Sequence, residues 1–200
     1  MSAYKQALAE YIAQQAKPFD KFGHQPRLYA LALEVGAGQD FDDDVVFAAA
    51  WMHDLGVFAG HRPESLEALA RWDNVAYALN KTPDVLRNLN FPEEKIPAVL
   101  EAIRTHQPNA EPTTKEAVIL RDADILEQLG AIGVLRATCK IGRDTRFLTF
   151  TSVIETLTRA LATLPGKIKL DSTRALAEPK IRMLGDFLEA VESEARGALY

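Results

Sequence analysis

The chain has 200 residues, of which 48% are hydrophobic and 26% charged, and its 23 basic and 28 acidic residues leave a net charge of −5. This composition is typical of a globular protein and excludes a disordered or fibrous chain. The single cysteine, Cys139, excludes an intramolecular disulfide and a thiolate-bound zinc site, so any metal must be bound by histidine and carboxylate. The acidic balance excludes a general attraction for nucleic acid polymers.

No segment of the sequence is typical of export or of a membrane span. The N-terminal stretch MSAYKQALAEYIAQQAK lacks the apolar core of a signal peptide. The longest apolar run, Val45 to Met52, is far shorter than the ~20 residues that cross a bilayer. With one cysteine and no such segment, we expect a cytoplasmic protein without a membrane partner. The sequence carries no signal for an oligomeric state.

Apolar residues recur at helical spacing along nearly the whole chain, which predicts an all-α fold. In the first half we expect a long central helix from Val45 to Asp54, because its residues are apolar on all sides. The acidic run from Asp40 to Asp44 is expected to cap that helix. The expected helices of the first half cover residues 3–16, 26–35, 45–54, 64–79, 84–89 and 92–105.

The second half is predicted to be helical as well. Thr113 and Glu116 have the spacing of a capping box, which predicts the start of a long helix that Gly130 ends. The expected helices of this half cover residues 113–129, 131–140, 148–164 and 173 to the C-terminus. Since no repeat or linker interrupts the pattern, we expect one domain. Its core covers about residues 22–140, and the helices of residues 148–200 pack on it.

His53 and Asp54 are adjacent at the end of the most apolar helix. An ionised carboxylate is costly in such surroundings unless a cation or several donors satisfy it, and a bound divalent metal would do so. His24 lies beside a predicted helix start, and Asp122 and Asp124 interrupt an otherwise apolar helix. Structural roles remain open at this point: Asp122 can pair with a neighbouring arginine, and Asp54 can cap the next turn.

The order of His24, His53, Asp54 and Asp124 resembles the HD-domain superfamily of all-helical, metal-dependent hydrolases. AAAWMHDLGVF is similar to the small-apolar helix of that family, which ends in His-Asp-x-Gly. ILRDADILEQLGAIGV is similar to the Asp-Ala-Asp and Gly-Ala-Ile-Gly stretch of small stand-alone bacterial members. The resemblance covers residues 22–140 and implies a single-domain HD helical bundle.

The resemblance also implies one divalent metal ion (Mn, Ni, Co, Zn, Fe or Mg) that is bound by His24, His53, Asp54 and one aspartate of the Asp-Ala-Asp stretch. The Ala-Asp-x-Leu setting favours Asp124, and Asp122 is the reserve candidate. Two residues apart on a helix, the two side chains point ~200° away from each other, so they do not easily reach one ion. The chain departs from the family at Ile125 and Gln128, where an arginine and a second acidic residue are common.

Two further histidines and a basic stretch can contribute to the same site. His106 ends a predicted helix and is expected to line the pocket, whereas His61 lies in a loop and needs no special role. The basic residues after the Asp-Ala-Asp helix are Arg136, Lys140, Arg143 and Arg146. By default they form a solvated face, but Arg136 and Lys140 can instead reach phosphate oxygens beside the metal.

From the donor set and the resemblance we predict a metal-dependent phosphohydrolase that attacks a small phosphate ester or nucleotide with a metal-activated water. The expected catalytic residues are Asp54, His106, Arg136 and Lys140. Three alternatives remain: an HD-type hydratase or lyase for a small nitrile-like substrate, a two-iron oxygenase, and a non-catalytic regulatory module with the same fold.

Overall fold

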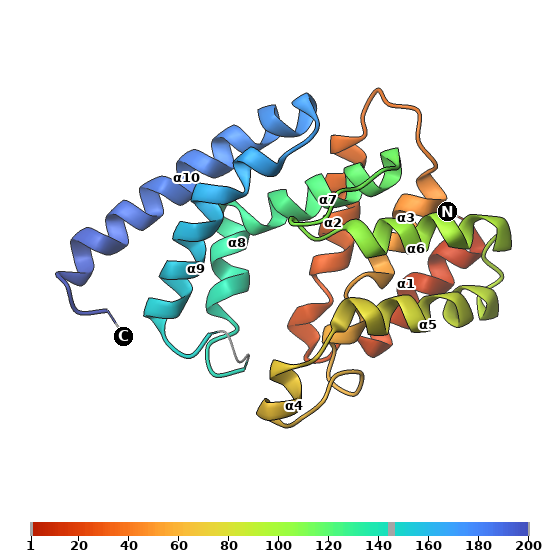
Figure 1. Cartoon of the computed structure of the whole chain (residues 1–200), viewed down its shortest axis with the longest axis horizontal. Coiled ribbons are helices and arrows are strands. Elements are labelled where there is room, and N and C mark those ends of the chain that lie inside the picture. The colour runs from red at the N-terminus through yellow and green to blue at the C-terminus, as the bar shows by residue number, and fades with distance from the viewer. Residues whose placement is uncertain (1, 144–146, 200) are drawn as a thin grey trace. The chain divides into compact units, whose positions relative to one another are not determined.

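The computed structural model describes residues 2–143 and 147–199, and all regular structure in these ranges is helical (Figure 1). Ten α-helices and four short 3-10 helices are joined by turns, and the only β-type pairing in the described ranges is an isolated bridge between Ala59 and Arg62. The predicted all-α fold is therefore confirmed. No helix in the described ranges is long and apolar enough to cross a membrane.

The chain divides into two compact units, residues 1–123 and 124–200. The boundary falls inside one continuous helix, α7 (Lys115–Gln128). The expectation of one domain with its core at about 22–140 stays a prediction.

Helix α3 is the central element of the first unit (Figure 1). All its residues from Val45 to Met52 are buried, and it packs against α1, α2 and α6. Helix α5 packs against α6 and against the 3-10 helix η2 (Leu55–Val57) that follows the His-Asp pair. The helices of this unit are α1 (Ala3–Gln15), α2 (His24–Val35), α3 (Asp43–Met52), α4 (Leu66–Ala70), α5 (Asn74–Asn88) and α6 (Ile96–Thr105).

An acidic cap begins α3, as the sequence predicts. Two lysines pair with the residues of this cap. Asp42 is the N-cap residue, and its Oδ1 accepts hydrogen bonds from the backbone N–H groups of Asp44 at 3.0 Å and Val45 at 3.4 Å. Lys95 lies 2.8 Å from carboxylate oxygens of both Asp42 and Asp44, and the buried Lys5 pairs with Asp43 and Asp44. Burial alone would raise the pKa of Asp44, but hydrogen bonds from Lys95, Tyr4 and Lys5 outweigh it and hold that pKa well below its usual range.

Some helix boundaries differ from those predicted. Helix α2 begins at His24, two residues before Pro26, so His24 is its first residue rather than part of the preceding turn. The helix expected over residues 64–79 is two helices, because Ser65 caps α4 and Asp73 caps α5. The helix expected over residues 84–89 is the end of α5, which continues through Pro83.

The start of α7 also corrects a prediction. Thr114, not Thr113, supplies the hydroxyl that accepts a hydrogen bond from the backbone N–H of Ala117 at 3.2 Å. Glu116 does not complete a capping box at this place. Its Oε1 accepts from the backbone N–H of Asp42 at 2.9 Å, so it joins α7 to the cap of α3.

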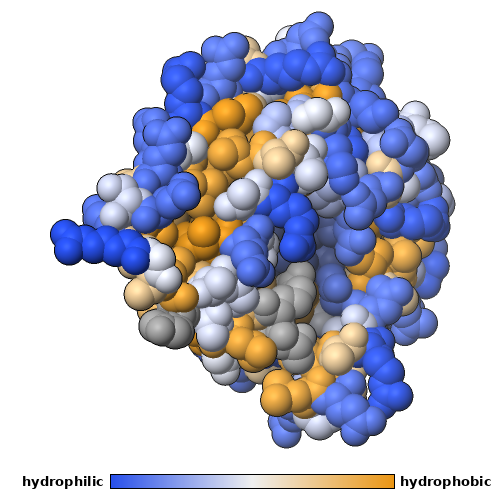
Figure 2. Space-filling view, turned by 60° about the vertical axis from the view of Figure 1, so that its left-hand side comes forward, coloured by the Kyte–Doolittle hydropathy of each residue, from blue (hydrophilic) through white to orange (hydrophobic). Residues whose placement is uncertain are grey.

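The second unit consists of the end of α7 and three further helices that pack on one another: α8 (Gly130–Thr138), α9 (Phe150–Thr163) and α10 (Asp171–Ala195). Gly130 begins α8 with a φ of +75°, a left-handed conformation that favours glycine. Several large apolar side chains of this unit are exposed, namely Leu135, Leu148 and Phe150. Figure 2 shows apolar surface scattered among hydrophilic side chains on the face it draws, which is common for globular proteins.

Gly56 provides a test of the packing that positions the His-Asp pair. A Cβ at Gly56 would lie 2.6 Å from the backbone oxygen of Asn74 and 2.8 Å from its Cα, at the first residue of α5. We expect Gly56→Ala to destabilise the protein by about 1–3 kcal/mol because the backbone has to move. Urea denaturation followed by circular dichroism measures the change.

The matched control is Gly166→Ala, because a Cβ at Gly166 has no neighbouring atom within 4 Å. We expect this variant to stay within about 0.5 kcal/mol of the parent. Equal stability of the two variants would contradict the close approach of η2 to α5.

Candidate metal centre

The His-Asp pair lies at the junction between α3 and η2. His53 is the C-cap residue of α3 and is 1% exposed, whereas Asp54 is the residue before η2 and its side chain is 21% exposed. Because α3 ends at Met52 and the backbone changes direction at Asp54, the two adjacent side chains are not held at the separation of a regular helix. Their closest polar atoms, Nε2 of His53 and Oδ2 of Asp54, lie 3.6 Å apart.

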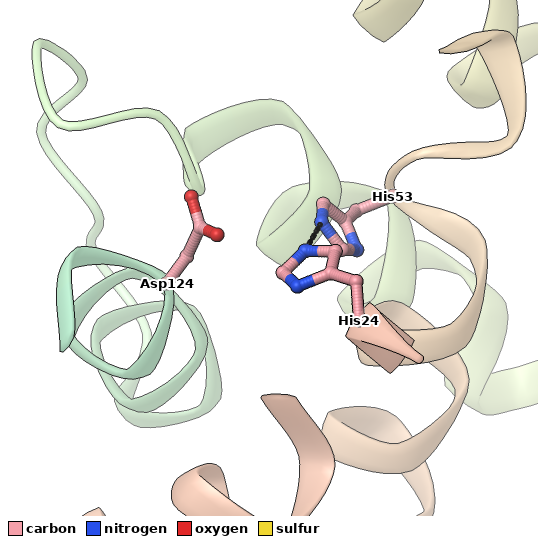
Figure 3. Close-up of side chains that lie close together, drawn as sticks. All are labelled: His24, His53 and Asp124. Atoms are coloured by element: carbon pink, nitrogen blue, oxygen red, sulfur yellow. Dashed lines mark hydrogen bonds between the residues drawn. The ribbon is translucent and has the colours of Figure 1, made fainter. Parts of the chain in front are cut away.

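His24 brings a third ligand-type atom to this place from the start of α2. Its Nε2 lies 3.2 Å from Nε2 of His53 and 3.6 Å from Oδ2 of Asp54. Figure 3 shows the two imidazoles edge to face, with ring centroids 5.1 Å apart. Nε2 of His24, Nε2 of His53 and Oδ2 of Asp54 therefore converge from two helices that pack on each other.

Backbone carbonyls determine which ring nitrogen carries the proton in two of the histidines. Nδ1 of His53 lies 3.0 Å from the carbonyl oxygen of Ala50, and Nδ1 of His106 lies 2.6 Å from that of Ile103. A carbonyl oxygen can only accept, so each Nδ1 carries a proton and donates it. In the neutral ring, each Nε2 then presents a lone pair, which is how metal-binding histidines are commonly oriented.

His53 and His106 occupy equivalent places in two packed helices. Each is the C-cap residue of its helix, α3 and α6, and each donates from Nδ1 to the carbonyl three residues earlier. The two rings are 4.9 Å apart between centroids. Because the C-terminal end of a helix carries partial negative charge, this pair of helix ends favours a cation.

Among the described residues of the first unit, three possible ligand atoms, from His53, Asp54 and His106, lie within 4.8 Å of one another. Nε2 of His24 and Nε2 of His53 lie within hydrogen-bond distance of each other, so one of them carries a proton unless a cation takes its place. The donor set, nitrogen and oxygen without sulfur, fits a first-row divalent cation.

Asp124 and Asp122 differ in their surroundings. Asp122 is fully buried, and its Oδ1 lies 3.7 Å from Nη1 of the equally buried Arg121. The predicted pairing of Asp122 with Arg121 is therefore found. Asp124 is 8% exposed, and its Oδ2 accepts a hydrogen bond from Nε2 of Gln128 at 3.0 Å.

The basic residues that follow α7 have partners of their own. Nη1 of Arg136 donates to the buried Glu127 at 3.1 Å and lies 3.9 Å from Oδ1 of Asp124. The ammonium group of Lys140 lies 5.3 Å from the centre of the Phe147 ring, and Arg143 donates to the carbonyl of Cys139. Arg146 lies outside the described residues.

Hydrogen bonds to other elements hold His61 away from the possible metal ligands. Its Nδ1 lies 2.9 Å from the hydroxyl of Tyr77, and its Nε2 lies 2.9 Å from Oε1 of Gln15. Burial, assisted by the charge of Lys81, lowers the pKa of His61, so the neutral ring is favoured at neutral pH. These contacts give His61 a structural role in joining the loop after η2 to α1 and α5.

Sequence reasoning placed His106 in the pocket but did not group it with His53 and Asp54. A histidine directly after a helix with buried apolar residues, as at His53 and His106, is the signal that both share. Gln128 was noted only as a departure from the family pattern, and nothing in its local sequence indicates its hydrogen bond to Asp124.

Known proteins and a family model resemble this chain. Residues 22–129, more than half of the chain, match the model of the HD domain. No curated protein matches the chain. YpgQ of Bacillus subtilis is 20% identical over 96% of this chain and 95% of its own, with a TM-score of 0.71. YpgQ has also been solved in complex with ADP, and that structure matches with 19% identity over 95% of this chain and 97% of its own and a TM-score of 0.69.

An HD-superfamily hydrolase of Bacillus thuringiensis is 21% identical over 96% of this chain and 95% of its own, with a TM-score of 0.66. At these identities the solved structures show a shared fold, and the match to the family model covers the His-Asp pair and both histidines around it. The chain belongs to the HD-domain family.

Proposed function

We propose that this protein is a metal-dependent phosphohydrolase acting on a small phosphate ester or nucleotide. The observation that carries the proposal is the convergence of Nε2 of His24, Nε2 of His53 and Oδ2 of Asp54, which lie within 3.6 Å of one another. The Nδ1 proton of His53 is engaged by a backbone carbonyl, so this ring offers its other nitrogen as a ligand.

The residues that would hold the metal are His24, His53, Asp54 and Asp124. A divalent cation bound to them supplies an electrophile that lowers the pKa of a water molecule and polarises a phosphoryl oxygen. The two imidazoles are neutral ligands, so the carboxylates of Asp54 and Asp124 supply the negative charge of the ligand set. The two negative charges of the carboxylates balance the two positive charges of the cation, which lowers the free-energy cost of burying them.

Asp54 and His106 are the groups best placed to handle protons. Asp54 is the more exposed member of the His-Asp pair, and a carboxylate has a second oxygen that can accept a proton from the attacking water. Nε2 of the neutral His106 can accept a hydrogen bond at the same place, because its Nδ1 is engaged by Ile103.

Arg136 and Lys140 are proposed to offset charge on the phosphate. A guanidinium has five N–H donors, so Arg136 can donate to Glu127 and still bind an anion. The complex of YpgQ with ADP supports a substrate that carries a phosphorylated nucleoside.

A two-metal centre is the second candidate, and the position of His106 beside the His-Asp pair favours it. The possible ligand atoms of His53, Asp54 and His106 lie within 4.8 Å of one another. If His106 is a ligand rather than a pocket residue, two ions can bind side by side, as the two-iron alternative requires. Metal analysis separates the two candidates, because the phosphohydrolase is expected to hold one equivalent without redox-active iron.

The first test of the proposal is turnover. The purified protein, freed of metal and reloaded with Mn²⁺, Ni²⁺, Co²⁺, Zn²⁺ or Mg²⁺, is incubated with a panel of nucleotides and phosphate esters. We expect release of phosphate or pyrophosphate with at least one metal, at a rate on the order of 1 s⁻¹ or faster for a good substrate. Absence of turnover with every metal, while analysis finds the site loaded, would overturn the proposed activity.

The ligand assignment is tested by substitution of the His-Asp pair. His53→Ala and Asp54→Ala should each weaken Mn²⁺ binding by more than about 100-fold. Removal of a residue that only hydrogen-bonds to a metal ligand typically costs about 10–100-fold in affinity, and removal of the ligand itself costs more. Phosphate release should disappear with the metal. Titration calorimetry measures the affinity, and Cys139→Ser, which changes an exposed side chain, serves as the control with no expected effect. Unchanged binding in either alanine variant contradicts the assignment.

The two aspartates of α7 are distinguished by a pair of matched variants. Asp124→Asn should lose the metal, whereas Asp122→Asn should keep it and unfold at lower urea concentration, because Arg121 is then left buried without its carboxylate. Metal analysis after gel filtration, together with urea denaturation, measures both effects. Retention of metal by Asp124→Asn and its loss from Asp122→Asn would reverse the assignment.

A further inference from the structure

We propose that Gln128 is a positioning residue that holds the Asp124 carboxylate in the orientation needed for metal binding. This inference rests on the proposed function, since it takes Asp124 as a metal ligand. It concerns the last turn of α7, where Gln128 is the final residue of the helix and lies four residues after Asp124.

The amide of Gln128 makes two contacts with the same residue. Its Nε2 donates to Oδ2 of Asp124 at 3.0 Å and to the backbone carbonyl oxygen of Asp124 at 3.2 Å. A side-chain amide nitrogen has two hydrogens, so both are engaged by Asp124. The amide cannot rotate without losing one of these bonds, and the carboxylate cannot rotate without losing the other.

The other carboxylate oxygen of Asp124, Oδ1, lies near the guanidinium group of Arg136, which also binds Glu127. Nη1 of Arg136 is 3.9 Å from Oδ1 of Asp124, too far for a hydrogen bond, and 3.1 Å from Oε2 of Glu127. Glu127 is 2% exposed, so its carboxylate needs this partner and keeps the guanidinium near it. Oδ1 of Asp124 therefore lies near the positive charge of Arg136 but beyond hydrogen-bonding distance of its Nη1.

The chemical nature of the side chain at 128 supports a positioning role. A lysine here would bring a positive charge that competes with a metal for the carboxylate. A neutral amide donates a hydrogen bond to Asp124 without adding a charge of its own. Hydrogen bonds that orient a ligand in this way typically contribute 10–100-fold to metal affinity.

The test compares Gln128→Leu with Gln14→Leu, a matched exposed glutamine of α1. Isothermal titration with Mn²⁺ on the whole protein should show about 10-fold or greater weakening in Gln128→Leu and none in Gln14→Leu. The urea midpoint of the metal-free protein is measured in parallel and should fall little, because the affected hydrogen bonds lie on a half-exposed side chain. The visible absorption of bound Co²⁺ should also change in Gln128→Leu only, since a freed carboxylate binds with a different geometry.

Gln128→Asn is the second variant in case the leucine variant does not fold. Asparagine keeps the amide but is one methylene shorter, so it cannot reach Oδ2 of Asp124 and should show the same loss of affinity. Mn²⁺ affinity and a Co²⁺ spectrum equal to those of the parent would overturn the positioning role. So would a lower urea midpoint with unchanged affinity. Retention of Mn²⁺ by Asp124→Asn would instead show that the ligand assignment itself is wrong.

Discussion

Nε2 of His24, Nε2 of His53 and Oδ2 of Asp54 meet at the end of α3, and their close approach is the constraint on which the arrangement of the first unit depends. The three atoms lie within 3.6 Å of one another, and the Nδ1 proton of His53 is directed away to Ala50. This approach requires that the helices carrying the three residues are held in place. The buried residues of α3 provide this rigidity, since moving His53 would move a helix that packs against α1, α2 and α6.

Ion pairs at the N-terminal end of α3 also hold this helix in place. Lys95 and Lys5 pair with the acidic residues of the cap, and Glu116 accepts a hydrogen bond from the backbone of Asp42. These contacts come from α1, the turn before α6 and the start of α7, so the elements around α3 are joined at its N-terminal end. An acidic cluster that resembles a metal site in composition is thus satisfied by lysines and backbone donors. Asp54, the candidate ligand carboxylate of this unit, lies beyond the other end of α3.

Local signals were enough to predict the central helix, its cap and the position of the His-Asp pair. A continuous apolar run indicates burial on all sides, and the acidic residues directly before it indicate the N-cap. The division between α4 and α5 was missed because two capping residues, Ser65 and Asp73, lie within a stretch whose apolar spacing stays helical. The break expected between residues 79 and 84 does not exist. Helix α5 continues through Pro83, and the buried hydroxyl of Thr82 donates to the carbonyl of Ala78 in that turn.

The contact of His106 with His53 and the hydrogen bond of Gln128 to Asp124 could not be predicted, for a different physical reason. His106 reaches His53 only because α3 and α6 pack together and end at the same level, which is a property of the tertiary structure. Gln128 is a neighbour of Asp124 on any helix, but whether its amide turns to the carboxylate or to water depends on the surrounding burial. A candidate ligand set can therefore be proposed from residue types in order. The groups that orient the ligands are ordinary residues, and only their hydrogen bonds distinguish them from surface side chains.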